Sequence, residues 1–128
     1  MALDISVGPA AAVPVYEQLR SQLAGAILGG RLSAGERLPT ARALASDAGV
    51  AVNTVIRAYG ELSREGLIEV RRRFGTVVAA GAAQAAPADV QAAATRLAMR
   101  AAAAGLTAEQ TVDLVRAAAT AVHEAPAG

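Results

Sequence analysis

The stretch that decides the fold is VNTVIRAYGELSREGLI, residues 52–68. Four of its residues recur at the spacing that places side chains on one face of an α-helix, and these are Val55, Ala58, Tyr59 and Leu62. Asn53, Arg57 and Arg64 fall on the opposite face, and Gly66 is a typical residue at a helix end. The spacing therefore predicts an amphipathic helix whose outer face is polar.

The sequence on both sides of this helix completes a supersecondary unit. Upstream, LPTARALASDAGV (residues 38–50) predicts a short helix with Thr40 as its N-cap and Gly49 as its left-handed end. Downstream, RRRFGT (residues 71–76) predicts the tip of a hairpin between two short strands. Two helices joined at a glycine and followed by a basic hairpin form a winged helix-turn-helix, a shape that holds duplex DNA.

The remaining segments follow from glycine, proline and the spacing of apolar residues. A first helix is expected from Pro14 to the pair Gly29–Gly30, with an apolar stripe of Val15, Leu19, Leu23 and Ile27. The other expected segments are a loosely ordered arm at residues 1–13, a connector at 32–39, strands at 67–70 and 76–79, and helices at 88–104 and 108–124, the last with a capping box of Thr107 and Gln110. This gives a winged helix-turn-helix domain at residues 1–80, a linker at 81–87 and a two-helix segment at 88–128, in a mainly α fold with a small β-hairpin.

Composition narrows the possible functions. Hydrophobic residues make up 54% of the chain but aromatic residues only 2%, so we expect a core of aliphatic side chains with Tyr16, Tyr59 and Phe74 as its rings. The net charge is only +1, but three of the twelve cations are consecutive, at residues 71–73, and a local basic surface is what phosphate binding requires. The absence of cysteine excludes disulfide and thiol chemistry. No apolar run reaches the ~18 residues of a membrane span, so a cytoplasmic location is expected.

Several motifs together resemble a known family. PVYEQLRSQLAGAILGGRLSAGERLPTARALA, NTVIRAY, EGLI and FGT, within residues 14–78, are similar to the GntR family of bacterial transcription regulators. Only residues 79–128 remain after the hairpin, which is too little chain for the large effector domains of many members. This short remainder resembles the YtrA-like group, whose C-terminal part is a small helical dimerisation unit. The resemblance implies a DNA-binding regulator, with genes for membrane transport as its targets.

Residues at the start of the 52–68 helix are expected to contact DNA. Arg57 can bridge the O6 and N7 atoms of a guanine or bind a phosphate, and the alternative is a solvated surface arginine. Asn53 and Thr54 occupy the first turn, which is the part that enters the major groove in helix-turn-helix docking. Their alternative role is local helix capping.

Further contacts are expected from the preceding helix and from the wing. The resemblance gives Arg42 a DNA-contacting role, and the alternative is an ion pair with Asp47. Thr40 is expected to donate a hydrogen bond to a phosphate as well as to cap its helix. The expected wing contacts are Arg71, Arg72 and Arg73, with Gly75 allowing close approach, because arginine gains from the negative potential of a narrow minor groove. The alternative is a hairpin whose charges only keep it soluble.

The chain departs from the family pattern at four positions. Ala51 stands where a capping serine or asparagine is common, so the helix after it is expected to start less firmly, by ~1 kcal/mol. Val52 and Ile56 stand where many members have arginine or a polar residue, and they are expected to touch thymine methyl groups or to pack against Phe74. Arg73 occupies a wing position that is often glycine. These departures affect the base preference rather than DNA binding itself.

The C-terminal helices are too apolar to stand alone. Their stripe is Val90, Leu97, Ala101 and Ala104 with Val112, Leu114, Val115 and Val122. Two isolated helices need a cover for such a surface, and a second copy of the same chain is the economical one. The alternative is that they pack on their own DNA-binding domain. The expected dimerisation residues are therefore Val90, Leu97, Ala101, Val112, Leu114, Val115 and Val122.

The predicted function is that of a homodimeric, sequence-specific regulator, a repressor, that binds an inverted repeat in double-stranded DNA. The alternatives are a DNA-architectural protein with little sequence preference and an adaptor whose winged helix binds protein. An enzyme is not expected, since the sequence contains no nucleophile–base pair, metal cluster or phosphate loop, and one histidine, His123, cannot build a metal site. No catalytic residue, metal or cofactor is therefore expected, and the sequence names no effector.

Overall fold

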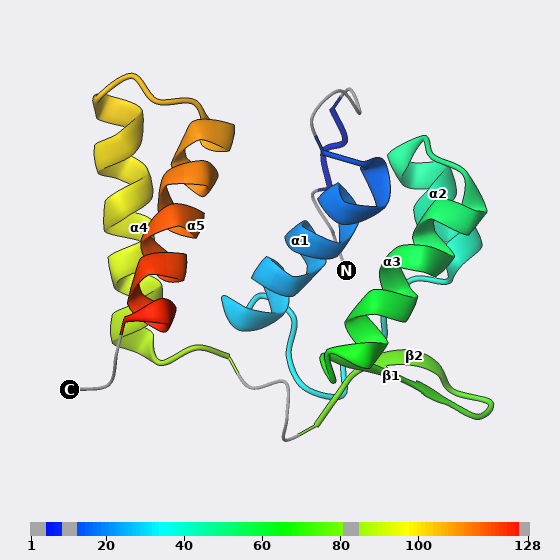
Figure 1. Cartoon of the computed structure of the whole chain (residues 1–128). Helices are drawn as coiled ribbons and strands as arrows, with labels where there is room; N and C mark the ends of the chain where they lie inside the picture. The colour runs from blue at the N-terminus through cyan, green and yellow to red at the C-terminus, as the bar shows by residue number, and fades with distance from the viewer. Residues whose placement is uncertain (1–4, 9–12, 81–84, 126–128) are drawn as a thin grey trace. The chain divides into compact units, whose positions relative to one another are not determined.

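The computed structural model of the chain describes residues 5–8, 13–80 and 85–125. Within these ranges the chain forms five helices and one hairpin (Figure 1), namely α1 (Val15–Leu28), α2 (Ala41–Ala48), α3 (Val52–Arg64), β1 (Ile68–Arg71), β2 (Gly75–Val78), α4 (Ala88–Ala103) and α5 (Ala108–Glu124). This confirms the predicted mainly α fold with a small hairpin. The chain divides into two compact units, residues 1–86 and 87–128. Part of the expected linker, residues 81–84, lies outside the described residues.

The core of the first unit forms between α1, α2, α3 and the hairpin. Its most deeply buried side chains are Leu19, Leu23 and Ile27 of α1, Val55 and Leu62 of α3, and Val77 and Val78 of β2. The α1 stripe is thus buried as predicted, except that Val15 at the helix start is half-buried. Of the three expected core rings, Tyr59 is buried, Tyr16 is half-buried and Phe74 is 47% exposed. The prediction that Phe74 belongs to the core is wrong, because this residue lies in the tip of the hairpin.

The junction between α2 and α3 forms as its capping residues predict. The Thr40 side-chain oxygen accepts a hydrogen bond from the Ala43 N–H at 3.1 Å. Gly49 ends α2 with φ 70°, a left-handed conformation that glycine adopts without the steric cost of a Cβ. Ala51 precedes α3 without any side-chain capping bond, so α3 begins without the ~1 kcal/mol that a polar cap contributes.

The wing has a third segment that the sequence did not indicate. β1 and β2 pair antiparallel from Ile68 opposite Val78 to Arg71 opposite Gly75. The predicted strands were displaced by one residue, so Arg71 and Gly75 belong to the strands, and residues 72–74 form the tip. On the other side of β2, Arg37 bridges Val77, and the flanking residues 35–38 exchange backbone hydrogen bonds of 2.8–2.9 Å with residues 76–78. The expected connector therefore continues the sheet and fixes the wing to the start of α2.

The N-terminal segment at residues 5–8 is ordered against α1. Two glutamines one turn apart bind its backbone: Gln22 accepts from the Ser6 N–H at 3.0 Å and donates to its carbonyl at 2.7 Å. Gln18 accepts from the Gly8 N–H at 2.8 Å. Ile5 and Val7 pack against the core from the alternate positions. The expectation of a loosely ordered arm is therefore wrong for residues 5–8, while residues 1–4 and 9–12 lie outside the described part of the chain.

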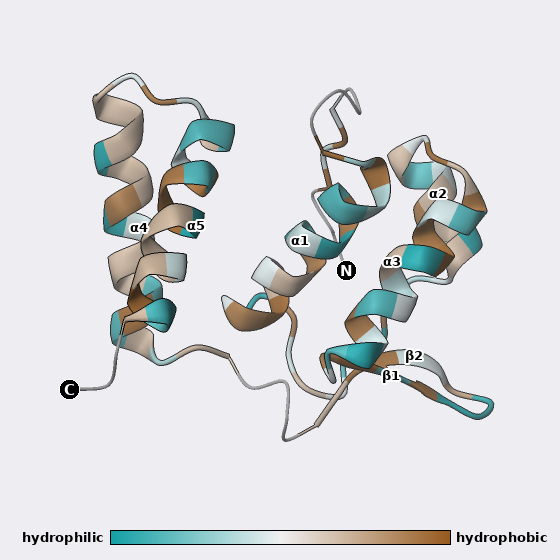
Figure 2. Cartoon of the chain, viewed as in Figure 1, coloured by the Kyte–Doolittle hydropathy of each residue, from teal (hydrophilic) through white to brown (hydrophobic). Residues whose placement is uncertain are grey.

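The second unit is a helical hairpin with little interior of its own. The predicted capping box is present, with Thr107 and Gln110 exchanging hydrogen bonds of 3.0 and 3.1 Å at the start of α5. Ala101 is the one residue of the described part of this unit that is buried. Figure 2 shows hydrophobic colouring along both α4 and α5. No helix among the described residues has the length and apolar character needed to cross a membrane.

Candidate nucleic-acid interface

The outer face of α3 carries the residues that the sequence pattern placed there. Asn53 and Arg57 are exposed, on the side opposite the buried Val55 and Leu62. Because these residues contribute nothing to the core, their side chains can contact a ligand without unfolding the helix. Thr54 is half-buried, so its side chain is less available than that of Asn53.

Two apolar side chains share the exposed part of α3. Val52 is 37% exposed and Ile56 is 53% exposed. Both side chains therefore remain accessible to thymine methyl groups, as the sequence predicted for one of their two roles. The ring of Phe74, their predicted alternative neighbour, lies under the Arg37 guanidinium, whose Cζ atom is 4.4 Å from the ring centroid.

Arg57 makes a contact that the sequence did not reveal. Its Cζ atom lies 3.7 Å from the centroid of the Tyr16 ring in α1. At this distance the cation interacts with the negative face of the ring. The two residues lie far apart in the sequence, and no periodic pattern links them.

Arg42 is exposed at the start of α2. The alternative role proposed for it, an ion pair with Asp47, is not formed, and no other carboxylate within residues 5–8, 13–80 and 85–125 pairs with it. Thr40 is also exposed, and its capping bond uses the side-chain oxygen as an acceptor, which leaves the hydroxyl hydrogen available for donation.

The three wing arginines differ in their surroundings. Arg71 forms an ion pair with Glu69, its neighbour but one in β1, at 2.9 Å. Arg72 and Arg73 are exposed in the tip, and no carboxylate of the described residues pairs with either. Arg73 has φ 66°, a left-handed conformation that costs a non-glycine residue ~1–2 kcal/mol. Gly75, at φ 101°, takes a conformation that L side chains rarely adopt.

Most glutamates of the first unit are held by other arginines. Arg20 of α1 pairs with Glu17 at 2.6 Å and with Glu65 beyond the end of α3 at 3.2 Å. The hydrogen bonding that Arg20 donates to the Glu17 carboxylate is the main cause that raises the pKa of the Arg20 guanidinium above its ordinary value. Arg64 pairs with Glu61 on α3. The Arg20–Glu65 pair joins α1 to the end of α3, and all three pairs remove negative charge from the surroundings of the exposed cations.

A buried tyrosine of α3 fixes the backbone just before α2. The Tyr59 hydroxyl donates a hydrogen bond of 2.7 Å to the backbone carbonyl of Pro39, just before the Thr40 cap. Burial raises the pKa of Tyr59 to about 12, so this hydroxyl keeps its proton at neutral pH. The bond ties α3 to the segment from which Arg42 projects.

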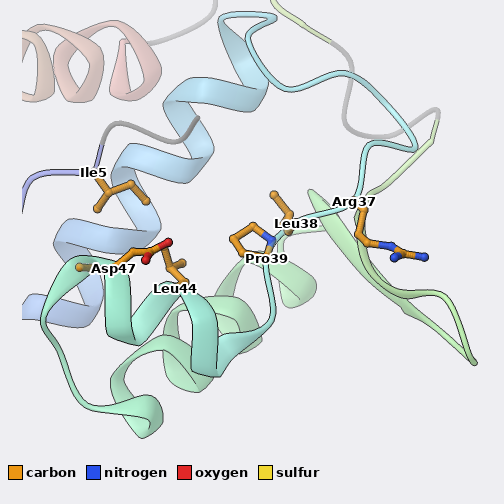
Figure 3. Close-up of a pocket in the computed structure, with 7 residues that line it drawn as sticks. Ile5, Arg37, Leu38, Pro39, Leu44 and Asp47 are labelled. Carbon is orange, nitrogen blue, oxygen red and sulfur yellow. The ribbon is translucent and has the colours of Figure 1, made fainter. Parts of the chain in front are cut away.

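The described residues offer little for catalysis. Among them no group of three or more His, Cys, Asp or Glu side chains is placed to hold a metal ion. A depression of about 340 Å³ beside α2 is lined by Ile5, Arg37, Leu38, Pro39, Leu44, Asp47 and Ala48. Figure 3 shows the Arg37 side chain pointing away from Leu44 and Asp47. The two charged residues of this depression therefore do not converge on one point.

The helix-turn-helix, the wing and the exposed cations beside α3 define a protein of the winged helix-turn-helix class. The model of the bacterial regulatory proteins of the gntR family matches residues 15–78. The chain belongs to the GntR family, and the similarity to YtrA proteins places it in the YtrA-like subgroup.

Two curated relatives illustrate this similarity. The HTH-type transcriptional regulator Rv1152 of Mycobacterium tuberculosis is 45% identical over 76 residues, which is 59% of this chain and 60% of that protein. The HTH-type transcriptional repressor YtrA of Bacillus subtilis is 40% identical over 78 residues, 61% of this chain and 60% of that protein. The chain thus spans about 60% of the length of these relatives. Their names agree with the interpretation as a regulator rather than an enzyme.

Solved structures share the fold. YtrA from Sulfolobus acidocaldarius, a GntR-family transcription factor, is 32% identical with a TM-score of 0.58, over 80% of this chain and 99% of that one. The DNA-binding domain of AraR, in complex with operator ORX1, is 26% identical with a TM-score of 0.54, over 58% of this chain and 94% of that one.

Proposed function

We propose that this protein is a transcriptional repressor that binds an inverted-repeat operator as a homodimer. The carrying observation is the outer face of α3, where Asn53 and Arg57 are exposed, together with Arg42 of α2 and Arg72 and Arg73 of the wing, which no described carboxylate neutralises. In this proposal α3 enters the major groove and its first turns read base edges. Arg42 and the wing contact the phosphate backbone, and the tip lies against the minor groove.

The structure of the AraR DNA-binding domain with its operator supports this mode of binding. That domain aligns with 58% of this chain, and its structure contains the operator ORX1. The repressor role is supported by the name of the Bacillus subtilis relative. From the resemblance to this subgroup, the proposal also includes that the protein binds chromosomal DNA in the cytoplasm and that its target genes encode membrane transport proteins.

A second copy of the chain is the proposed cover for α4 and α5. Their large apolar side chains remain exposed: Val90 52%, Leu97 39%, Met99 68%, Val112 50%, Leu114 51%, Val115 41% and Val122 71%. Val112, Val115 and Val122 are spaced to share one face of α5, as in helices that pack against partner helices. Since an inverted repeat presents two equivalent half-sites, a two-fold dimer matches it.

Binding-site selection on random duplexes tests the DNA-binding proposal. The parent should return a two-fold symmetric consensus. Asn53→Ala and Arg57→Ala should each lower the ratio of specific to random affinity about tenfold, because one good bidentate base contact discriminates by ~1–3 kcal/mol. Ser63→Ala is the matched control: Ser63 is exposed in the last turn of α3, far from the first turns, so the ratio should not change.

The same measurement separates the competing functions. A parent that binds all duplexes equally is an architectural protein. A parent without salt-dependent DNA binding is an adaptor, and either result contradicts the proposal. An unchanged consensus in both Asn53→Ala and Arg57→Ala would place base readout on other residues, with Thr54, Ile56 and the wing as the next to change.

Light scattering tests the dimer. Val115→Asp should give a monomer, because it places a charge within the apolar stripe of α5. Thr120→Asp is the control: this exposed residue lies on the polar face of the same helix with Asp113 and Arg116, and the substitution adds the same charge. A Val115→Asp variant that remains dimeric contradicts the proposed interface.

A further inference from the structure

Arg57 has an aromatic partner where an acidic one would be usual. Glu61 follows it by one helical turn, the separation at which arginine and glutamate side chains commonly pair. Glu61 instead pairs with Arg64, and Arg57 lies over the ring of Tyr16 with its Cζ 3.7 Å from the centroid. The Arg57 guanidinium is therefore held in place while its charge stays unneutralised.

The carboxylate beside the ring is engaged as well. Glu17 adjoins Tyr16 in α1 and pairs with Arg20 at 2.6 Å, and Arg20 also binds Glu65. No carboxylate within the described part of the chain pairs with Arg57. The acids on both sides of the stacked pair are thus kept away from it.

Stacking constrains an arginine in a way that suits base recognition. The ring covers a face of the planar guanidinium, whereas the five N–H donors point outward in its plane. A bidentate contact with guanine O6 and N7 uses two of those in-plane donors. A stacked guanidinium can therefore keep its aromatic contact while its edge binds a base, and fewer rotamers must be frozen when DNA binds.

We propose that Tyr16 is a positioning residue that holds the Arg57 guanidinium for base readout, so that a side chain of α1 contributes to the sequence specificity of α3. This proposal rests on the proposed function, since it needs α3 to read DNA. It concerns the Tyr16 ring rather than its hydroxyl, and this distinguishes positioning from a direct contact between the tyrosine and a phosphate.

The stack itself can be tested without DNA. In the free protein, the Arg57 Nε–Hε proton should resonate upfield because of the ring current of Tyr16. The shift should persist in Tyr16→Phe and disappear in Tyr16→Leu, which keeps an apolar side chain but removes the ring. An Arg57 resonance that is the same in the parent and in Tyr16→Leu would overturn the proposal, whatever the protein does with DNA.

The role in specificity needs the ratio of specific to random affinity for the same variants. Tyr16→Leu should lower this ratio about two- to fivefold, the effect of an exposed cation–π contact of ~0.5–1 kcal/mol at 1.4 kcal/mol per tenfold. Tyr16→Phe should keep the ratio of the parent. In an Arg57→Ala background, Tyr16→Leu should have no further effect, because the residue that it positions is absent.

The outcomes separate this proposal from the proposed function. A parent that selects a consensus, with the same ratio in Tyr16→Leu, overturns the positioning role alone. The same holds if Tyr16→Phe loses as much as Tyr16→Leu, or if the loss persists in the Arg57→Ala background. A lower melting temperature with an unchanged ratio would mean that the contact only joins α1 to α3. A parent that selects no sequence overturns both proposals.

Discussion

The wing arginines should contribute unequally to DNA affinity, although they are consecutive in the sequence. Arg71 is paired with Glu69 at 2.9 Å, whereas Arg72 has no carboxylate partner among the described residues. Removing both members of the Glu69–Arg71 pair changes no net charge. If the pair persists on DNA, the charge-neutral variant Glu69→Gln with Arg71→Gln should bind DNA with the salt dependence of the parent, whereas Arg72→Gln should lose a phosphate contact.

The magnitude follows from counterion release. Each phosphate contact contributes about −0.9 to the slope of log affinity against log salt. Since a dimer carries two wings, Arg72→Gln should reduce the slope by about 1.8. Between 50 and 200 mM salt, a fourfold change, the affinity of Arg72→Gln should therefore fall about 12-fold less than that of the parent.

Fluorescence anisotropy with one labelled duplex at several salt concentrations measures these slopes. Melting temperatures should be the same, because the exposed tip contributes nothing to the core and an exposed ion pair contributes only ~0–1 kcal/mol. The reasoning is refuted if the Glu69→Gln, Arg71→Gln variant loses as much slope as Arg72→Gln. In that case Arg71 leaves Glu69 to meet a phosphate when DNA binds.

Three further predictions concern stability. Gly60→Ala in α3 and Gly25→Ala in α1 should each raise the melting temperature of the first unit, measured by calorimetry, by several degrees. An added Cβ meets nothing within 4 Å at either site, and alanine in a helix is favoured over glycine by ~0.5–1 kcal/mol. A lower melting temperature for either variant would contradict this prediction. Arg73→Gly should stabilise the protein by ~1 kcal/mol in urea unfolding, because it relieves a left-handed φ of 66°, while weakening DNA binding at low salt. The contribution of the protonated Tyr59 to the free energy of unfolding should be fully present below pH 10, the ordinary pKa of tyrosine, and should be lost towards pH 12, because the folded protein holds this proton more tightly than the unfolded chain. Tyr59→Phe loses the hydrogen bond to Pro39 and should therefore be less stable at neutral pH. In urea unfolding at several pH values, this variant should lack the part of the fall at high pH that is due to Tyr59.

The sequence predicted the elements whose stability depends on local patterns. The apolar spacing of α1 and α3, the Thr40 cap and the left-handed Gly49 are encoded within a few residues of where they act, and the structure confirms them. The exposed side of α3 follows from the same periodicity, so the positions of Asn53 and Arg57 could be predicted. The ends of the wing strands were displaced by one residue, because alternation over four residues does not fix the register.

The features that the sequence did not predict depend on contacts between distant segments. The segment at residues 35–38 joins β2 through backbone hydrogen bonds, which leave no pattern in the side chains. The backbone of residues 5–8 is bound by the amides of Gln18 and Gln22, which in sequence resemble any polar residues of a helix surface. The sequence likewise does not indicate that Glu69 pairs with Arg71 rather than with Arg72 or Arg73.

The distribution of ion pairs explains how a chain with a net charge of +1 can present a basic surface. Glu17, Glu61, Glu65 and Glu69 bind three arginines, namely Arg20, Arg64 and Arg71. These pairs involve α1, α3 and β1, and among the described residues they leave Arg42, Arg57, Arg72 and Arg73 of the proposed interface without a carboxylate partner. If the same glutamates paired with the arginines of the proposed interface, the composition and the net charge would be unchanged, but the proposed DNA-facing surface would be neutralised. Affinity for DNA should therefore depend on which arginines form ion pairs with the glutamates. A substitution that lets a glutamate pair with an interface arginine should lower the affinity as much as a substitution that removes that arginine.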